Sequence, residues 1–263
     1  MKTWQCWLLA VVVTLGSVVW QRMTGPTHPA RVGVELGGEA VKGKLLRSGT
    51  TGENLPVRLR AGEGVTGEVA WRRYPTAAAW TVVPMRRDGP DLVAELPHQP
   101  AAGKIEYQVR LHDGGRIVTI PERAAVARFK DPVPAWVLIP HVLAMFAGML
   151  LATRAGLEAA LGRPRLGPLA WAAFWLILVG GFVLGPAVQK YAFGAWWTGV
   201  PFGWDLTDNK TLAAGVAWAG AVAALRGGRW GRTAVLVAAL VTLVVFAIPH
   251  SAMGSQLDWS KVE

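Results

Sequence analysis

Five long apolar runs constrain the fold of this 263-residue chain more than any other feature. They cover residues 4–20, 133–153, 168–188, 211–225 and 233–248. Because a helix needs about 20 residues to cross the hydrocarbon core of a bilayer, such runs indicate membrane spans. The composition agrees, since 52% of the residues are hydrophobic and 17% are charged, which is less charge than soluble domains usually carry. We therefore predict five membrane-spanning helices.

The first run, from Trp4 to Trp20, fits either a signal peptide or a retained anchor. It ends in Trp20-Gln21-Arg22 and lacks the small-x-small pattern of a cleavage site. We favour an uncleaved anchor, and we assign residues 1–29 to this anchor and a linker. Cys6 is the single cysteine, which excludes an internal disulfide and every multi-cysteine metal site.

Residues 30–131 have a different pattern, in which apolar and polar residues alternate between turn signals. Four stretches follow this period of two, which is typical of half-buried strands: 57–60, 67–72, 91–96 and 104–111. The segment has about the length of one immunoglobulin-like domain, so we predict an all-β immunoglobulin-like sandwich. We expect Trp71 and Trp80 in its core rather than on a ligand-stacking surface.

Basic residues in two short loops determine the predicted orientation. Arginines follow the second run (Arg154, Arg163, Arg165) and the fourth (Arg226, Arg229, Arg232). The positive-inside rule places both loops in the cytoplasm. Because successive spans cross the membrane in opposite directions, the N-terminus then lies inside. The sandwich, the segment 186–210 and the C-terminal tail lie outside. The predicted fold is a membrane α-helical bundle with an inserted extracytoplasmic sandwich, in which residues 132–263 form four of the five spans.

Charge also narrows the function classes. The last four predicted spans have no charged residue in the middle, which argues against a pump or an ion-coupled transporter. The net charge of +10 is not accompanied by a nucleic-acid-binding pattern, so we expect no nucleic acid as a partner. Small residues recur at helical spacing in the second and third runs and favour close helix packing: Ala144, Gly148, Ala152, Gly181 and Gly185.

The aromatic segment, residues 186–210, lies between the third and fourth runs. Its rings alternate with glycines: Tyr191, Phe193, Trp196, Trp197, Phe202 and Trp204. Tryptophan and tyrosine prefer the membrane–water boundary, so a simple aromatic belt is one interpretation. We favour a structured cap over the bundle, because interleaved glycines let the backbone pack closely against rings. A third interpretation is a re-entrant segment that dips into the bilayer.

Polar residues close this segment and allow two interpretations. Thr207 or Asp208 would cap the amino terminus of the fourth span, since such side chains accept hydrogen bonds from free backbone N–H groups. Alternatively, Asp205, Asp208 and Asn209 would bind a cation through oxygen ligands. We favour the cap, because Lys210 competes with a cation and the ligands are few.

His141 and His250 each follow an Ile-Pro pair and lie near the outer ends of the second and fifth spans. They are the one plausible bis-histidine haem site. If the second helix begins at Val133, His141 lies about 10 Å deeper than His250, at a rise of about 1.5 Å per residue. If Pro140 starts the helix, the two are level. We favour interfacial histidines without a cofactor.

Catalytic motifs are not found in the sequence. Ser251, His250 and Asp258 are close in sequence, but no motif marks the serine as a nucleophile. There is no phosphate-binding glycine loop and no metal-ligand spacing. We assign no catalytic residue and no metal ligand, and we expect Trp259 in the tail to lie at the membrane interface.

Four stretches resemble a known family: residues 21–27, 190–194, 205–211 and 248–251. The family consists of bacterial inner-membrane proteins with an extracytoplasmic immunoglobulin-like domain, a C-terminal helical bundle and no assigned function. The resemblance covers nearly the whole chain. It implies the location and domain order, but no activity and no site residue.

Three functional hypotheses follow. The first is a non-enzymatic accessory or assembly factor that binds a membrane or periplasmic protein at the outer face. The second is a redox subunit that binds haem b or a quinone there. It would use His141, His250 and rings of the aromatic segment, namely Tyr191, Trp196, Trp197 and Trp204. The third, an enzyme for a lipid-linked substrate with Asp205 or Asp208 as base, has the least support.

Overall fold

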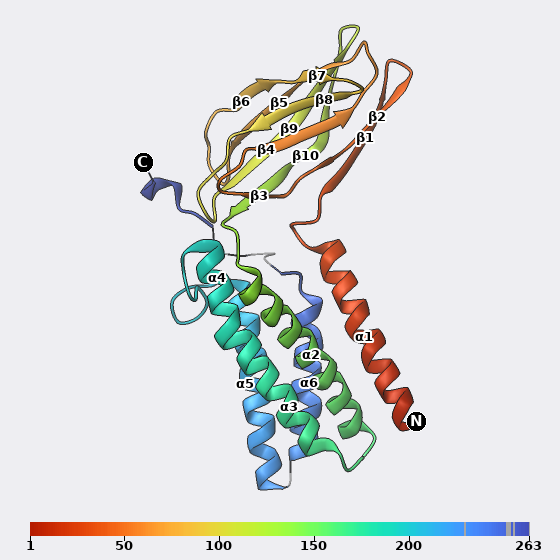
Figure 1. The fold of residues 1–263 in the computed structure, drawn as a ribbon, viewed down its shortest axis with the longest axis vertical. Coiled ribbons are helices and arrows are strands. Elements are labelled where there is room, and N and C mark those ends of the chain that lie inside the picture. Colours follow the sequence, from red (N-terminus) through yellow and green to blue (C-terminus); the bar gives the residue numbers. More distant parts are fainter. Residues whose placement is uncertain (229, 251–253, 255, 263) are drawn as a thin grey trace. The chain divides into compact units, whose positions relative to one another are not determined.

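A computed structural model describes residues 1–228, 230–250, 254 and 256–262 of the chain. The chain divides into a helical unit, residues 1–26 and 133–255, and a β-unit, residues 27–132 and 256–263 (Figure 1). This division differs from the expected one at the tail, which belongs to the β-unit rather than to the bundle. Arg229 and Ser251, which entered the sequence argument, lie outside the described residues.

The β-unit consists of two five-stranded sheets. The first has the order β1-β2-β4-β8-β7, with β1 Ala30–Leu36, β2 Glu39–Leu45, β4 Leu55–Arg60, β8 Asp91–Leu96 and β7 Arg86–Asp88. The second has the order β3-β10-β9-β5-β6, with β3 Ser48–Thr50, β10 Arg116–Lys130, β9 Lys104–Asp113, β5 Thr66–Arg73 and β6 Thr81–Pro84. The four strands predicted from the period of two are confirmed as β4, β5, β8 and β9.

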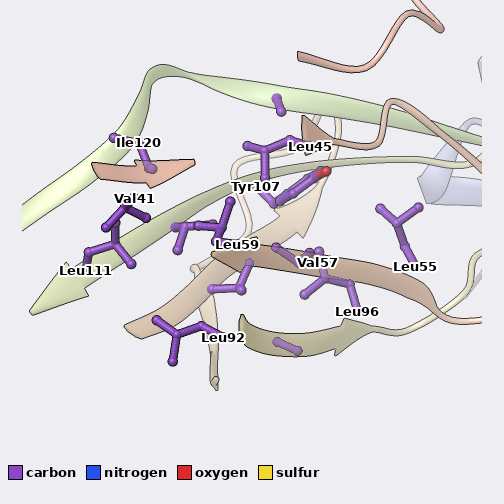
Figure 2. Packing of buried hydrophobic residues seen from close by; sticks show 14 of the residues in the cluster. Val41, Leu45, Leu55, Val57, Leu59, Leu92, Leu96, Tyr107, Leu111 and Ile120 are labelled. Atoms are coloured by element: carbon purple, nitrogen blue, oxygen red, sulfur yellow. The ribbon is translucent and has the colours of Figure 1, made fainter. Parts of the chain in front are cut away.

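One hydrophobic core joins the two sheets (Figure 2). Leu45, Leu59 and Leu96 come from the first sheet, and Tyr107 and Leu111 come from the second. Alternate residues of β9 are buried, as the period of two requires. The hydroxyl of Tyr107 donates a hydrogen bond of 2.7 Å to the carbonyl of Leu46, which satisfies the polar end of this buried ring.

The two tryptophans expected in the core differ. Trp71 is partly buried and packs against the core. Trp80 is not part of the core, and the guanidinium of Arg72 lies 4.5 Å from the centre of its ring. The expectation for Trp80 was wrong, because Trp80 lies between β5 and β6, outside the alternating pattern that points side chains inward.

The tail packs against the β-unit. Trp259, on the 3-10 helix η2 (Trp259–Lys261), is buried, and its Nε1 donates to the carbonyl of Tyr74 over 3.1 Å. The guanidinium of Arg73 lies 4.7 Å from the ring centre. Leu257 adds a backbone hydrogen bond to Ala102. The expectation that Trp259 lies at the membrane interface was therefore wrong, since the β-unit covers this ring.

The helical unit contains α1 (Thr3–Thr24), α2 (Ala135–Ala160), α3 (Leu166–Leu178), α4 (Gly185–Phe193), α5 (Leu206–Gly227) and α6 (Gly231–Ala247). A π-helical segment, η1 (Val179–Leu184), joins α3 to α4. Three described helices are long and apolar enough to cross a membrane: α1, α2 and the continuous helix Leu166–Phe193. The other two expected spans lie in α5, which is not among these candidates, and in α6, which is apolar but has only 17 residues.

Small residues lie where helices approach each other. A Cβ atom on Gly148 of α2 would lie 3.1 Å from Ile177 of α3, and one on Gly181 would lie 2.6 Å from the Thr211 methyl group of α5. The expected close packing through these glycines is confirmed. On the opposite half of α2, Gly156 leaves the space that Ala239 of α6 occupies.

Helix α1 is hydrogen-bonded to the bundle. Ser17 and Gln21 donate to the carbonyl of Phe246, and Trp20 donates to the carbonyl of Ala247. These carbonyls belong to the last turn of α6 and have no partner within that helix. The side chains of α1 therefore supply the C-terminal hydrogen bonds of α6, and α1 packs as the fifth helix of the bundle.

Arg154 lies inside the bundle rather than in a loop. Helix α2 continues seven residues past the expected end of the span at residue 153 and ends at Ala160. Arg154 and Glu158, one turn apart on this extension, are both buried and form an ion pair of 2.5 Å. The guanidinium also lies 5.3 Å from the ring centre of Trp7 on α1. The expectation that Arg154 lies in a loop was wrong, because the sequence shows the charge of Arg154 but not that Glu158 is buried beside it.

Candidate functional site

The aromatic segment is more regular than its composition indicates. Residues 186–193 belong to α4, and residues 206–210 form the first turn of α5, so the loop itself covers residues 194–205. Gly194 ends α4 with a φ angle of 81°, in the left-handed region that glycine adopts without strain. Lys190 donates to the Gly194 carbonyl over 2.7 Å, which adds a cation at the helix C-terminus.

Asp208 holds the loop to α5. One oxygen of its carboxylate, Oδ2, accepts hydrogen bonds from the backbone N–H of Thr198 at 2.6 Å and of Gly199 at 3.0 Å. It also accepts from the Thr198 hydroxyl at 3.2 Å. The neighbouring Asn209 accepts from the backbone N–H of Val200 at 2.7 Å. Two adjacent side chains of α5 thus satisfy three consecutive amides of the loop.

Gly199 permits this close approach. A Cβ atom at this position would lie 2.6 Å from Cβ of Asp208 and 2.7 Å from Oδ1 of Asn209. Burial raises the pKa of Asp208 above its usual value, and the hydrogen bond from the Thr198 backbone opposes that rise. The sequence did not reveal this role, because the donors lie nine and ten residues before their acceptor.

The helix cap is Asp205, two residues before Thr207 and three before Asp208, the two expected caps. Asp205 accepts from the N–H of Thr207 at 2.8 Å, so Thr207 and Asp208 are not the N-cap. The oxygens that the cation interpretation required from Asp208 and Asn209 accept N–H donors instead. Within the described residues, no group of three His, Cys, Asp or Glu side chains is arranged to hold a metal ion.

Five of the six rings of the aromatic segment fall into two groups. Trp197 stacks on Phe182 with the ring centres 5.9 Å apart, and its Nε1 donates to the Val200 carbonyl. Tyr191 contacts Trp136 of α2 edge to face at 6.2 Å. In contrast, Trp196, Phe202 and Trp204 are 59%, 81% and 86% exposed. We call these three exposed residues the aromatic rim. The loop is therefore a structured cap from which three large rings project.

His141 contacts the π-helical segment. It lies in the second turn of α2, and its Nδ1 is 2.9 Å from the carbonyl oxygen of Gly180. Because a carbonyl can only accept, the proton is on Nδ1, and Nε2 carries a lone pair. The Gly180 carbonyl also accepts the π-helical bond from the N–H of Gly185. Single π turns frequently occur at functional sites.

His250 follows the end of α6, and its side chain is exposed. Helix α2 begins at Ala135, with Pro140 inside it, so the level arrangement that a start at Pro140 would give is not formed. His250 nevertheless lies within electrostatic range of His141, and also of Lys210 and Asp205. His141, Lys210 and the N-cap residue Asp205 therefore all contribute to the electrostatic environment of His250.

Lys210 is a buried cation that sequence reasoning did not assign to the site. Its ammonium donates to the carbonyl of Ile248 over 2.7 Å, just beyond the end of α6. Burial lowers the pKa of Lys210 from 10.5 to about 8, and the charge of Asp205 opposes this shift. The sequence signal that could have assigned Lys210 to the site is a charged residue near the start of an otherwise apolar helix.

Asp258 belongs to the β-unit, whereas His250 belongs to the helical unit. The carboxylate of Asp258 caps η2 in the β-unit by accepting a hydrogen bond from the N–H of Ser260. No family model matches the chain, and no curated protein or solved structure matches it.

Proposed function

We propose that the protein is an integral membrane protein that acts as a non-enzymatic accessory or assembly factor and binds a partner protein through the aromatic rim. The observation that carries this proposal is the contrast between backbone and side chains in the loop 194–205. Asp208 and Asn209 fix the backbone amides of residues 198–200, while Trp196, Phe202 and Trp204 project from the surface.

Such an arrangement favours binding. Tryptophan and other aromatic residues are enriched among the residues that dominate binding energy at protein interfaces. A loop that is already ordered loses less conformational entropy when a partner binds. The carboxylates of Asp205 and Asp208 are engaged by N–H donors, so neither is placed as a free general base for a lipid-linked substrate.

The location and the topology are part of the proposal. We place the chain in a bacterial inner membrane with five spans, a cytoplasmic N-terminus and an extracytoplasmic β-unit and C-terminus. The resemblance described above and the arginine-rich loops support this placement. We also propose that the β-unit is immunoglobulin-like. Two observations support this. In the sheet β3-β10-β9-β5-β6, the short β3 runs parallel to β10, the last strand in the chain, and Trp71 lies on β5.

Photocrosslinking in intact cells tests the partner. A benzophenone amino acid would replace Phe202 or Trp204, and in a control it would replace Trp175, which is 54% exposed on α3. We expect one discrete protein adduct from the two rim positions and none from Trp175. The adduct should disappear when Trp196→Ala is added to either rim variant. Lipid adducts alone at all three positions would reduce the rim to an aromatic belt and contradict the proposal.

His141 favours a second candidate, a redox subunit that binds haem b or a quinone at the outer face. Its Nδ1–H is bound to Gly180, which leaves Nε2 as ligand or acceptor, and His250 is within electrostatic range. An absorption spectrum of the purified protein, before and after dithionite, tests this candidate. A Soret band that is lost in both His141→Ala and His250→Ala would support bound haem. A featureless visible region would exclude the haem form of this candidate. Extraction and analysis of bound quinone tests the other cofactor.

A further inference from the structure

The outer face of the first sheet carries a group of cations on three neighbouring strands. Side chains alternate along these strands, so Val41 of β2 and Leu59 of β4 are buried in the core, while the residues next to them point outward. Four of the outward residues are basic and exposed: Arg31 on β1, Lys42 and Lys44 on β2, and Arg60 on β4. We call these four residues the basic face.

The strand register brings these cations together. Arg31 lies directly opposite Lys44, and Lys42 lies directly opposite Arg60. Opposite residues of antiparallel strands have Cβ atoms about 5 Å apart, and like charges at this spacing destabilise a sheet. Four positive charges therefore lie within a small area, at a cost in stability that an anionic ligand would offset.

The carboxylates of the first sheet do not neutralise the basic face. Asp91 of β8 lies opposite Arg60, but its carboxylate accepts a hydrogen bond of 2.9 Å from Arg58. Glu35 is the outward carboxylate of β1, and it lies opposite Ala40 rather than opposite a cation. Among the described residues, no side-chain hydrogen bond or ion pair engages the four cations of the basic face.

The second sheet shows the opposite arrangement of charges. Arg72 lies opposite Glu106 and forms an ion pair of 2.6 Å with it. Glu68 lies opposite Arg110, and their ion pair is 3.3 Å long. These cations are paired with anions across neighbouring strands, whereas the cations of the basic face lie opposite other cations. The contrast indicates that the anion for the basic face comes from another molecule.

The edge position of β1 indicates the form of that anion. In the described part of the chain β1 is the edge strand of its sheet, with β2 as its hydrogen-bonded neighbour (Figure 1). An extended peptide can add to such an edge, where main-chain hydrogen bonds give affinity and alternate side chains give specificity. Alternate side chains of an added strand would lie beside Arg31. A second copy of β1 would add its own Arg31 to this face, so repulsion between like charges disfavours it.

We propose that the basic face and the edge of β1 bind an extended acidic segment of a partner protein, in which acidic residues recur at every second position. The segment pairs with β1, and its carboxylates lie on the outer face, where Arg31 and Lys44 are the first cations they meet. The basic face belongs to the β-unit and the aromatic rim to the helical unit. The two proposals are therefore independent, because the rim adduct does not require the basic face.

The test is fluorescence anisotropy of a labelled peptide in which glutamate alternates with threonine, titrated with the full-length, detergent-solubilised protein. We expect binding that weakens as the salt concentration rises, because salt screens exposed charges. A peptide of the same composition with its glutamates grouped at one end should bind more weakly, because it cannot place all its carboxylates on one face of a strand. A peptide in which lysine replaces glutamate should not bind.

The double variant Lys42→Gln, Lys44→Gln should weaken binding by about 10-fold, since each exposed ion pair contributes up to about fivefold. The double variant Arg116→Gln, Arg123→Gln changes two exposed residues of β10 and is the matched control. It alters the net charge equally and should leave the affinity unchanged. Bound peptide should slow hydrogen exchange in β1 and leave β6, the edge strand of the second sheet, unaffected.

Three results would overturn the proposal. The first is no binding of the alternating peptide, or equal losses of affinity in the two double variants. The second is equal affinity for the two glutamate peptides, because the surface would then recognise charge without strand addition. The third is slower exchange of β1 and β2 in nanodiscs that contain phosphatidylglycerol, but not in phosphatidylcholine nanodiscs, together with no peptide binding. That result would assign the surface to lipid headgroups.

Discussion

The ammonium group of Lys210, in the first turn of α5, donates a hydrogen bond of 2.7 Å to the carbonyl oxygen of Ile248, just beyond α6. This contact places a cation at a helix C-terminus, where it interacts favourably with the helix dipole. Ser17, Trp20 and Gln21 of α1 bind carbonyls of the same turn of α6. The end of α6 is therefore held from two sides, by α1 and by α5.

Lys210 should make stability depend on pH. Burial lowers its pKa from 10.5 to about 8, so the folded protein releases this proton at a lower pH than the unfolded chain does. Between these values the unfolded state binds more protons, and the free energy of unfolding rises with pH. The rise is at most about 3 kcal/mol, at about 1.4 kcal/mol per pKa unit. Below about pH 8 Lys210 contributes no slope.

Thermal unfolding of the wild type and of Lys210→Met, followed from about pH 7 to pH 10, measures this contribution. We expect the wild type to gain stability relative to the variant across the upper part of this range. Lys190→Met, at an exposed lysine on α4, serves as the control and should follow the wild type. Parallel profiles for the wild type and Lys210→Met would show that Lys210 does not titrate in this window.

Asp208 and Asp205 should differ in their sensitivity to substitution. Asp208→Ala leaves the part-buried amide of Thr198 and the buried amide of Gly199 without their acceptor, at a cost of about 2 to 3 kcal/mol. Asp205→Asn should cost less than about 0.5 kcal/mol, because asparagine caps helices as well as aspartate does. Hydrogen exchange of the two amides, followed by mass spectrometry, checks the assignment. Faster exchange in Asp205→Asn than in Asp208→Ala would contradict it.

Gly199 should not tolerate a methyl group. Its added Cβ would meet Cβ of Asp208 at 2.6 Å and Oδ1 of Asn209 at 2.7 Å, so Gly199→Ala must displace the loop from α5. We expect a loss of about 1 to 3 kcal/mol, as for other overpacked sites, and loss of the rim adduct. Gly220→Ala on α5, the helix that the loop packs against, is the matched control, because nothing lies within 4 Å of its added Cβ. It should stabilise the protein by up to about 1 kcal/mol.

The sequence predicted those features that depend on local patterns. Period-two alternation located β9, because each inward residue is buried by the facing sheet. The lengths of the apolar runs located the helices. The role of Asp208 was not predictable, since its partners are backbone amides of a loop whose course no side-chain pattern encodes. The burial of Trp259 was also missed, because it depends on Tyr74, which is distant in sequence.

Arg154 and Glu158 give the last prediction. Both side chains are at most 3% exposed, and each is the other's partner at 2.5 Å. Arg154→Met leaves the carboxylate of Glu158 buried, with Arg163 at 4.0 Å as its remaining cation, and should cost about 3 to 5 kcal/mol. The double variant Arg154→Met, Glu158→Leu should recover most of this loss, because buried apolar residues of similar volume replace ion pairs well.

Chemical or thermal unfolding of the single and double variants measures the difference. Arg58→Met on β4 is the control for loss of an arginine, because its ion pairs with Asp88 and Asp91 are exposed, and exposed ion pairs contribute little to stability. If the double variant is as unstable as Arg154→Met alone, the buried charge of Glu158 is not the source of the loss. The contact of Arg154 with Trp7 on α1 would then be the stabilising interaction.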